Sequence, residues 1–377
     1  MLKPGESQRE NGSYDYRYTD AKGNRRCIYA PNLDELRRKE DRIQRDAFDG
    51  IDGAAGEITV SALVERYMSL RRNLKHNSMR AYQTGINRIN ADPFGERRIN
   101  TIRISDAKAF LISLHDQGLK QNSIGIVHNI LRPAFELAVE DDAIRKNPFK
   151  FKLCDVIAND AQVRNALTKD QQEKYLAVAR EWDACHAVDY ADDIEILLHT
   201  GLRVSELYGL TIRDVDLDAR RIHVNKQLCR TGQRPYFVTS PKTASGIRYI
   251  PLTEQACLAI RRILQKRRGV KVEMMVDGYT GFLLLDKDSR PKTAMHLQSH
   301  MRRLQNEVNR RYGESFPRVT PHILRHTFCT NAQQAGMDIK ALQAVMGHSN
   351  AGITLDVYTH VDYDAVERAF MNVEAAL

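Results

Sequence analysis

A break in the hydrophobic pattern near residue 148 is the feature that most constrains how this chain folds. Asn147-Pro148 ends a helical region, and residues 150–165 then lack clear periodicity, which is typical of a linker. A chain of 377 residues is also too long for one ordinary domain. We therefore predict a multidomain α+β fold with domains at residues 1–53, 57–150 and 165–377.

The first region has the pattern of a small β-sheet followed by one helix. Ser13–Tyr18 and Asn24–Ala30 read as short strands joined by a glycine-containing turn, which predicts a hairpin. Asn32 and Glu35 have the spacing of a capping box, so a charged helix is expected from there to about Phe48. A sheet face that carries basic side chains can enter the major groove of DNA, and the candidates for such contacts are Arg17, Lys22, Arg25 and Arg26.

The second region is predicted to be all-α. Leu63, Tyr67 and Leu70 fall at helical spacing, and so do several apolar residues of 126–138. Basic residues are interleaved with them. An ordinary solvated surface would also explain these basic residues. Their positive charge is nevertheless suited to DNA phosphates, and the candidates we select for DNA contacts are Arg71, Arg72 and Arg80.

The third region mixes helices with a few strands. A capping-box sequence opens it at Thr168, and a short antiparallel β-meander is expected at about 221–251. The helices are predicted at about 168–182, 189–200, 204–210, 254–267, 295–311, 321–335 and 338–346. This region is therefore expected to be mainly α, with a small antiparallel sheet.

Charge and hydropathy narrow the possible partners and the cellular location. The net charge of +9 suits a partner made of phosphates, although it is weak evidence alone. No apolar run approaches the roughly 18 residues that span a bilayer, so no membrane association is expected. The polar residues 1–10 do not have the pattern of a signal peptide. We expect a cytoplasmic protein whose six scattered cysteines are reduced.

Two basic residues of the third region stand at turns. The sequence TGLRVSEL of residues 200–207 places Arg203 at an elbow between two helices, where backbone N–H groups favour an anion. Lys242 is expected at the tip of a hairpin loop between strand-like residues 236–239 and 247–252. Either residue alone would pass for an ordinary surface side chain.

A third motif lies in the sequence TPHILRHT of residues 320–327. Thr320 and Pro321 predict a helix start, and His322 and Arg325 are three residues apart on one helix face. His322 and His326 have a spacing found in zinc sites. However, Ile323 stands where such a motif needs a glutamate, so no metal is expected.

The last motif follows a helix that is expected to end at Gly347. His348 comes next, and Tyr358 follows ten residues later in a Tyr-Thr-His sequence that the other downstream tyrosine, Tyr363, lacks. Arginines, a lysine, histidines and a tyrosine together suit phosphoryl transfer to a side chain. Paired guanidinium groups grip the phosphate, a lysine protonates the leaving oxygen, and histidines move protons. No metal, nucleotide or other cofactor is needed.

The order Arg…Lys…His-x-x-Arg…Gly-His…Tyr resembles the tyrosine recombinase (phage integrase) family. The sequences TGLRVSEL, PKTASGIRYIPL, TPHILRHTFCTN and MGHSNAGITLDVYTH carry the resemblance through the third region. The second region resembles the core-site-binding domain of that family. The whole chain looks most like integrases of Gram-positive conjugative transposons, whose small N-terminal domain, a three-stranded sheet with one helix, binds arm-type DNA repeats.

This resemblance implies a role for each residue of the motifs. Arg203 and Arg325 would hold the phosphate, Lys242 would be the general acid, His322 the base or proton shuttle, His348 a phosphate ligand and Tyr358 the nucleophile, while Glu206 would support Arg203. It also implies a homo-oligomer, such as a tetrameric synapse on paired double-stranded DNA sites, with an excisionase and a DNA-bending host protein as further partners. The alternatives are an Xer-like resolution recombinase, a type IB topoisomerase and a DNA-binding regulator without enzymatic activity.

Overall fold

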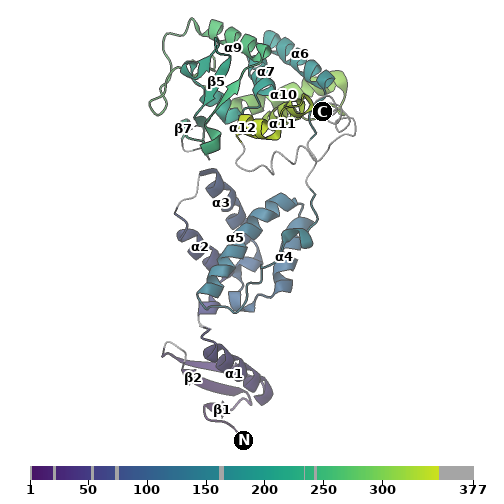
Figure 1. The fold of residues 1–377 in the computed structure, drawn as a ribbon. Helices are drawn as coiled ribbons and strands as arrows, with labels where there is room; N and C mark the ends of the chain where they lie inside the picture. The colour runs from purple at the N-terminus through teal and green to yellow at the C-terminus, as the bar shows by residue number, and fades with distance from the viewer. Residues whose placement is uncertain are drawn as a thin grey trace, which may run out of the picture. The chain divides into compact units, whose positions relative to one another are not determined.

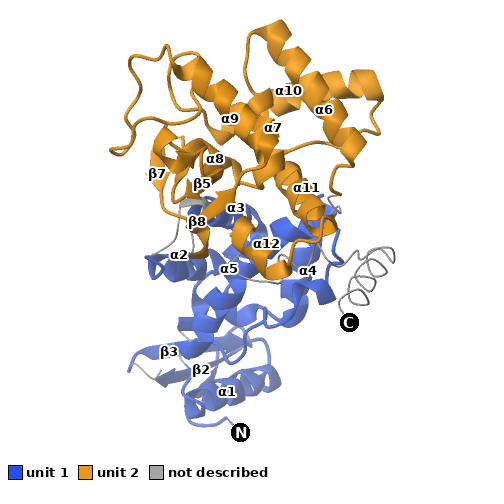
Figure 2. Cartoon of the chain, turned by 45° about the horizontal axis from the view of Figure 1, so that its top comes forward, with its two compact units in different colours: residues 1–162 blue, residues 163–377 orange. Residues whose placement is uncertain are grey.

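The computed structural model describes residues 2–19, 23–51, 55–72, 76–160, 165–232, 234–241 and 244–347. The chain forms two compact units, residues 1–162 and 163–377 (Figure 2). The division between them falls within the segment predicted as a linker. The finer boundaries at 1–53, 57–150 and 165–377 remain predictions.

The first unit begins with a three-stranded antiparallel sheet in the order β1-β2-β3. Its strands are Glu6–Gln8 (β1), Tyr14–Thr19 (β2) and Arg25–Ala30 (β3), and the helix Leu33–Phe48 (α1) follows (Figure 1). The side chain of Asn32 caps this helix by accepting a hydrogen bond from the Glu35 N–H at 2.8 Å. The predicted hairpin and helix are confirmed, whereas β1 has too short a pattern to be read from the residues alone.

Four α-helices form most of the rest of the described first unit. They are Val60–Ser69 (α2), His76–Ala91 (α3), Ile104–Asp116 (α4) and Gln121–Glu140 (α5). Leu63 and Ile130 lie in their common apolar core, as the helical spacing predicted. Leu70 differs from the prediction, because α2 ends at Ser69 and Leu70 is 64% exposed at its C-terminus. Helix α5 continues through Pro133.

The described second unit is mainly helical. Its helices are Lys169–His186 (α6), Ala191–Thr200 (α7), Val204–Gly209 (α8), Glu254–Arg267 (α9), Ala294–Tyr312 (α10), Pro321–Gln334 (α11) and Ile339–Met346 (α12). Helix α7 packs against both α9 and α11. Every residue from Ala191 to Leu198 is buried, so this helix forms the centre of the unit.

The strands of the second unit form two small antiparallel sheets. One contains Val215–Asp216 (β4), Arg221–Val224 (β5) and Arg248–Pro251 (β8), and the other contains Gln227–Cys229 (β6) and Phe237–Thr239 (β7). A hairpin between residues 236–239 and 247–252 was predicted, and this prediction is wrong. Strand β7 pairs with β6, while β8 pairs with β5 in the register Ile222 opposite Ile250.

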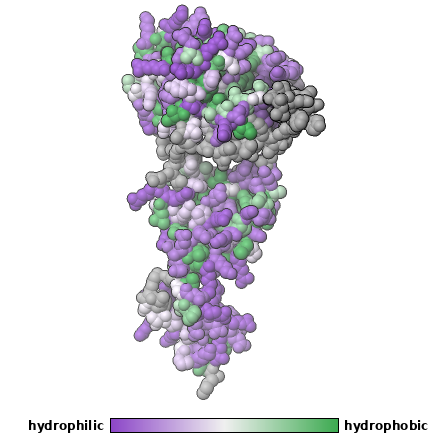
Figure 3. Space-filling view, viewed as in Figure 1, coloured by the Kyte–Doolittle hydropathy of each residue, from purple (hydrophilic) through white to green (hydrophobic). Residues whose placement is uncertain are grey.

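The expected fold class is confirmed: a sheet-plus-helix segment, a helical segment and a mainly α unit with small antiparallel sheets. Hydrophilic residues predominate on the face seen in Figure 3, as expected when apolar side chains gather in the cores. Within the described ranges, every helix is too short or too polar to cross a lipid bilayer.

Candidate active site

The elbow between α7 and α8 places Arg203. Gly201 ends α7 with a φ of 62°, in the left-handed region that glycine adopts without strain. A Cβ at this position would overlap Cδ1 of Phe328 on α11, so the close approach of the two elements also favours glycine. Arg203 comes two residues after Gly201, immediately before α8. The sequence thus predicted the position of Arg203 correctly.

Glu206 holds Arg203 in place. Its carboxylate is fully buried and accepts hydrogen bonds from Nη1 of Arg203 at 2.7 Å and from the Arg203 backbone N–H at 3.0 Å. Burial alone would raise the pKa of Glu206, but the hydrogen bond and charge of Arg248 and the charge of Arg203 outweigh it and lower the pKa. Glu206 is therefore ionised at neutral pH, and its predicted contact with Arg203 is present.

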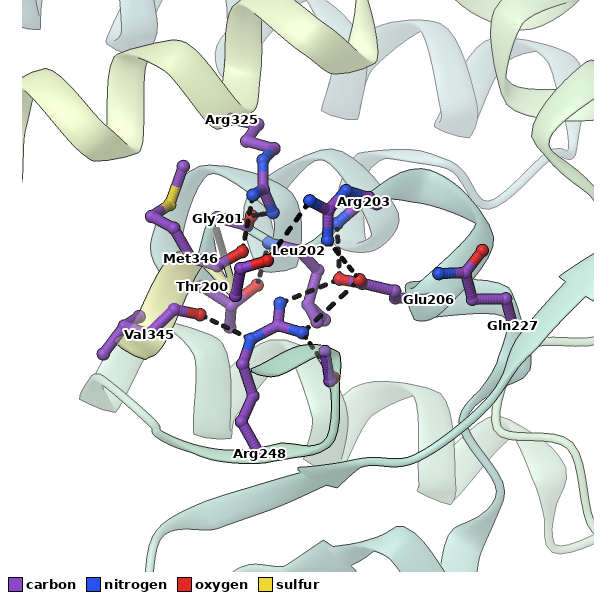
Figure 4. A network of polar contacts seen from close by, with 12 residues as sticks. Thr200, Gly201, Leu202, Arg203, Glu206, Gln227, Arg248, Arg325, Val345 and Met346 are labelled. Carbon is purple, nitrogen blue, oxygen red and sulfur yellow. Dashed lines mark hydrogen bonds and ion pairs between the residues drawn. The ribbon is translucent and has the colours of Figure 1, made fainter. Parts of the chain in front are cut away.

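Arg325 comes from α11 and is 6% exposed. Its Nη1 donates to the Gly201 carbonyl at 2.6 Å and its Nη2 to the Met346 carbonyl at 2.6 Å. Burial, and then the charge of Arg203, lower the pKa of Arg325 to about 9, which still leaves it charged at neutral pH. Arg203 and Arg325 therefore converge at one place, and their guanidinium groups lie next to each other in Figure 4.

His322 stands three residues before Arg325, in the first turn of α11. Thr320 caps this helix by accepting a hydrogen bond from the Ile323 N–H at 3.3 Å, and Pro321 is its first residue, as predicted. His322 is exposed whereas Arg325 is buried. The first turn of α11 therefore offers an imidazole at the surface close to the guanidinium cluster.

Arg248 is a part of this cluster that the sequence analysis missed. It opens β8 with a side chain only 6% exposed, and its Nη2 donates to Oε2 of Glu206 at 2.8 Å. Its Nη1 donates to the Gly246 carbonyl at 2.9 Å and its Nε to the Val345 carbonyl at 2.6 Å. A signal was present in the sequence: Arg248 shares the inward strand positions with Ile250, where an arginine is buried only if it has partners.

The end of α12 joins all three arginines. The carbonyls of Val345, Met346 and Gly347 accept hydrogen bonds from Arg248, Arg325 and Arg203 respectively, the last at 3.4 Å (Figure 4). Carbonyls at a helix C-terminus lack helical partners and carry partial negative charge, so cations satisfy them well. The last described residue of the chain, Gly347, therefore lies at the guanidinium cluster.

Three predicted catalytic residues, Lys242, His348 and Tyr358, lie outside the described residues. The described neighbours on both sides of Lys242 are Pro241 and Ala244. The strands before and after it, β7 and β8, belong to different sheets and do not form the predicted hairpin. Strand alternation identifies the inward residues of each strand but not its pairing partner, which explains the wrong prediction.

The basic candidates on the N-terminal sheet do not share one face. Arg17 lies opposite Cys27 and Thr19 opposite Arg25, so Arg17 and Arg25 point to the same side. Arg26 lies opposite Tyr18 and points to the other side. The prediction of one face carrying Arg17, Arg25 and Arg26 is therefore wrong for Arg26, because consecutive strand residues alternate. Lys22 lies outside the described residues.

Among the helical candidates, Arg80 lies on α3, and Arg71 and Arg72 follow the end of α2. Arg71 lies against two tyrosine rings, 5.4 Å from the centroid of Tyr67 and 5.5 Å from that of Tyr82, and donates to the Tyr82 hydroxyl at 3.2 Å. This side chain is therefore held by its own domain. Arg72 and Arg80 are exposed.

Comparison with known proteins shows the family. Residues 165–365 match the phage integrase family, and residues 1–47 match the DNA binding domain of the Tn916 integrase. The transposase from transposon Tn916 of Enterococcus faecalis is 37% identical over 378 residues, which cover 97% of this chain and 93% of the relative. The chain belongs to the phage integrase family. It is thus a site-specific tyrosine recombinase, a DNA strand-transferring enzyme.

Solved structures agree with this assignment. The Tn1549 transposon integrase in complex with transposon right end DNA is 38% identical, with a TM-score of 0.77 over 84% of this recombinase and 100% of that chain. The same integrase in complex with a circular intermediate DNA gives a TM-score of 0.78 at 37% identity, over 84% of this recombinase and 99% of that chain. The recombinase therefore shares both sequence and fold with integrases solved on DNA.

Proposed function

We propose that this recombinase integrates and excises a mobile DNA element through a covalent tyrosine intermediate. The observation that carries the proposal is the convergence of Arg203 and Arg325, from distant parts of the chain, at the end of α12. The relatives that are 37% identical over 97% of this chain are named transposases, and residues 1–47 match a domain that is named for the Tn916 integrase. Both similarities favour an integrase over an Xer-like resolution enzyme, a relaxing topoisomerase or a regulator without activity.

The chemical step is a transesterification at one DNA phosphate. The phenolic oxygen of Tyr358 forms a bond to phosphorus while the bond to the 5′-oxygen breaks, which leaves a 3′-phosphotyrosyl link and a free 5′-hydroxyl. His322 accepts the phenolic proton, directly or through a relay, and Lys242 supplies a proton to the leaving oxygen. The link conserves the energy of the phosphodiester, so a partner strand's 5′-hydroxyl reseals it without nucleotide or metal.

The arginines stabilise the charge of this step. Arg203 and Arg325 donate to the non-bridging oxygens, and His348 adds a further phosphate contact. The fork of Arg325 is pre-set by its two carbonyl acceptors and that of Arg203 by Glu206, so neither side chain has to be ordered when DNA binds. Held in this way, both groups are already oriented before the phosphate arrives.

DNA contacts outside the active site come from the other candidates. We assign Arg71, Arg72 and Arg80 to core-type sites and Arg17, Lys22, Arg25 and Arg26 to arm-type sites. Strand exchange needs two paired duplexes, so a tetrameric synapse is proposed, with an excisionase and a DNA-bending host protein setting the direction in the cytoplasm. The structure of the Tn1549 integrase in complex with DNA supports DNA as a partner of this recombinase. The similarity of that integrase to this chain supports the proposed binding of core-type sites.

A nicked suicide duplex tests the proposal. The nick lets the short product diffuse away, so a covalent protein–DNA adduct accumulates and can be resolved on a denaturing gel before and after protease treatment. The duplex should carry a sequence from the ends of the element. Wild-type protein should form the adduct and Tyr358→Phe should not, while both bind the duplex equally. An adduct formed by Tyr358→Phe at the wild-type rate would refute the nucleophile, and Tyr363→Phe serves as the matched control.

A further inference from the structure

Glu206 lies between two arginines, and only one of them belongs to the proposed phosphate clamp. We propose that Arg248 is a positioning residue that neutralises Glu206, so that the carboxylate orients Arg203 without cancelling its positive charge. This inference rests on the proposed roles of Arg203 and Arg325. It adds a residue whose action on the phosphate passes through another side chain.

The geometry around Glu206 is that of one carboxylate shared by two cations. Oε1 accepts from Nη1 of Arg203 at 2.7 Å, and Oε2 accepts from Nη2 of Arg248 at 2.8 Å. Figure 4 shows the carboxylate between the two guanidinium groups, with Arg325 on the Arg203 side. The Arg203 side chain is 35% exposed, whereas that of Arg248 is 6% exposed. Arg203 can therefore reach a bound phosphate, whereas Arg248 is buried and pairs with Glu206 inside the unit.

The charges of the cluster explain why a second arginine is useful. Arg203 and Glu206 alone would form a neutral pair, which would leave Arg325 as the single net positive charge among these residues. With Arg248 included, three guanidinium groups and one carboxylate leave a net charge of two. A phosphodiester carries one negative charge, and attack by a phenolate adds a second in the transition state. The cluster with Arg248 therefore matches the transition state, and the cluster without it falls one charge short.

Arg248 also fixes two pieces of backbone that lead to other predicted catalytic residues. Its Nη1 binds the carbonyl of Gly246, in the connection that carries Lys242, and its Nε binds the carbonyl of Val345, three residues before His348. A Cβ on Gly347, whose φ is 64°, would lie 2.9 Å from Nη1 of Arg248, so this guanidinium packs directly on the backbone that leaves α12. The same side chain thus combines a charge role with a packing role.

These two roles predict different responses to a second substitution. If Arg248 only supports packing, replacing Glu206 as well removes another buried partner, and cleavage falls further. If Arg248 neutralises Glu206, removing both charges restores the net charge of two and recovers part of the lost rate. A neutral pair of similar volume is also tolerated well in a protein interior. The sign of the change between the single and the double variant therefore decides between the roles.

The experiment measures the single-turnover rate of adduct formation on the nicked duplex for the full chain. Arg248→Gln should lower the rate on the order of 10²-fold, like the loss of one transition-state donor. Glu206→Gln combined with Arg248→Gln should be roughly tenfold faster than Arg248→Gln alone, because about one unit of charge is restored. Arg248→Lys, which keeps the charge, should also exceed Arg248→Gln. A double variant no faster than Arg248→Gln, or an Arg248→Lys variant equally slow, overturns the proposal.

Arg267 provides the matched control. Its side chain is 8% exposed and pairs with Glu273 at 2.7 Å, so Arg267→Gln also removes a buried arginine from an ion pair in the same unit. This variant should keep cleavage within about threefold of wild type at equal folded fraction, since it removes no charge from the cluster. If Arg248→Gln does not fold, the comparison moves to the Glu206→Gln background. In that background, Arg248→Gln should lower the rate of adduct formation by less than about tenfold. A decrease of about 10²-fold or more overturns the proposal.

Failure of this inference can be distinguished from failure of the proposed function. If Arg203→Lys abolishes cleavage but the double variant shows no recovery, the phosphate clamp stands and the charge role of Arg248 is wrong. If Arg203→Lys cleaves at the wild-type rate, the clamp itself is wrong, and so is the role of Arg248 that depends on it. DNA binding and thermal unfolding of each variant are measured in parallel, so that loss of fold is not read as loss of chemistry.

Discussion

In the proposed mechanism, Arg203 has two tasks that only a guanidinium combines. One part of its fork donates to Glu206 at 2.7 Å, another donates to the Gly347 carbonyl at 3.4 Å, and the side chain is still exposed enough to meet a phosphate. Lysine has the same charge but a single ammonium group without the planar fork. Replacing Arg203 with Lys therefore keeps the positive charge but removes the planar fork that orients it.

The residue-scale prediction is that Arg203→Lys lowers cleavage by about 10³-fold, as for other arginines that stabilise phosphoryl transfer, while DNA binding is retained. The lysine ammonium cannot donate to Glu206 and to two phosphate oxygens at the same time. Binding survives because it depends on many other phosphate contacts. Single-turnover cleavage and gel-shift titration on the same duplex check both parts. Equal losses of cleavage and binding would mean that Arg203 acts in affinity and not in the chemical step.

At the scale of elements, the sequence predicted what local patterns determine. Helix α9 was predicted at 254–267 and found at Glu254–Arg267, because Thr253 caps it and an apolar stripe defines it. The convergence of Arg203 and Arg325 was expected only through the resemblance to a family, since nothing local brings together residues so far apart in the chain. The pairing of β7 with β6, and the contact of Arg248 with Glu206, depend on tertiary packing that strand alternation does not encode.

The elbow at Gly201 gives the element-scale prediction. Gly201→Ala should lower the free energy of unfolding of the second unit by about 3 kcal/mol, which combines the left-handed backbone penalty with overpacking against Phe328. Gly336→Ala is the matched control, because Gly336 also follows a helix with a φ of 86° but has nothing within 4 Å of the place where an added methyl group would lie. It should cost about 1 kcal/mol, from the backbone alone. Urea unfolding of both variants measures the difference, and equal costs would show that the contact with Phe328 is unimportant.

At the scale of the whole molecule, DNA affinity is expected to be spread over both units. We propose that the exposed Arg72 and Arg80 of the first unit, in a chain of net charge +9, supply phosphate contacts that take no part in the chemical step. Each contact releases counterions from DNA, so affinity should fall linearly with salt on logarithmic axes. Because these contacts take no part in the chemical step, their loss should lower DNA affinity without lowering the rate of cleavage.

This separation predicts a change in salt dependence. Replacing both Arg72 and Arg80 with Ala should reduce the slope of log K against log salt by roughly two, close to one for each phosphate contact. The rate of cleavage at saturating protein should stay near that of wild type. Arg310→Ala is the control, because Arg310 is equally basic and 72% exposed but is paired with Glu307 on α10 and lies among none of the proposed DNA contacts. Titrations at several salt concentrations measure the slope, and an unchanged slope in the double variant would remove these residues from the interface.

In the proposed synapse, recombination, unlike binding, requires several copies of the enzyme, and we propose that the sequence after Tyr358 links them. Residues 362–376 have apolar side chains at helical spacing, Val366, Phe370 and Val373, and they lie outside the described residues. A short amphipathic helix of this kind needs an apolar partner, for which we propose a neighbouring copy on DNA. Changing these three residues to Ser should therefore abolish recombination between two sites while single-site binding is retained.

A second set of substitutions on the same segment isolates the apolar face. Glu367→Ser, Arg368→Ser and Glu374→Ser alter an equal number of residues but leave the apolar positions intact, so recombination should persist. Recombination between two sites on a plasmid and gel-shift titration of one site give the two readouts for each set. If the apolar substitutions reduce binding and recombination to the same extent, the segment supports the enzyme's own fold and not its assembly. The loss of a contact made only between copies would not weaken the binding of a single copy to one site.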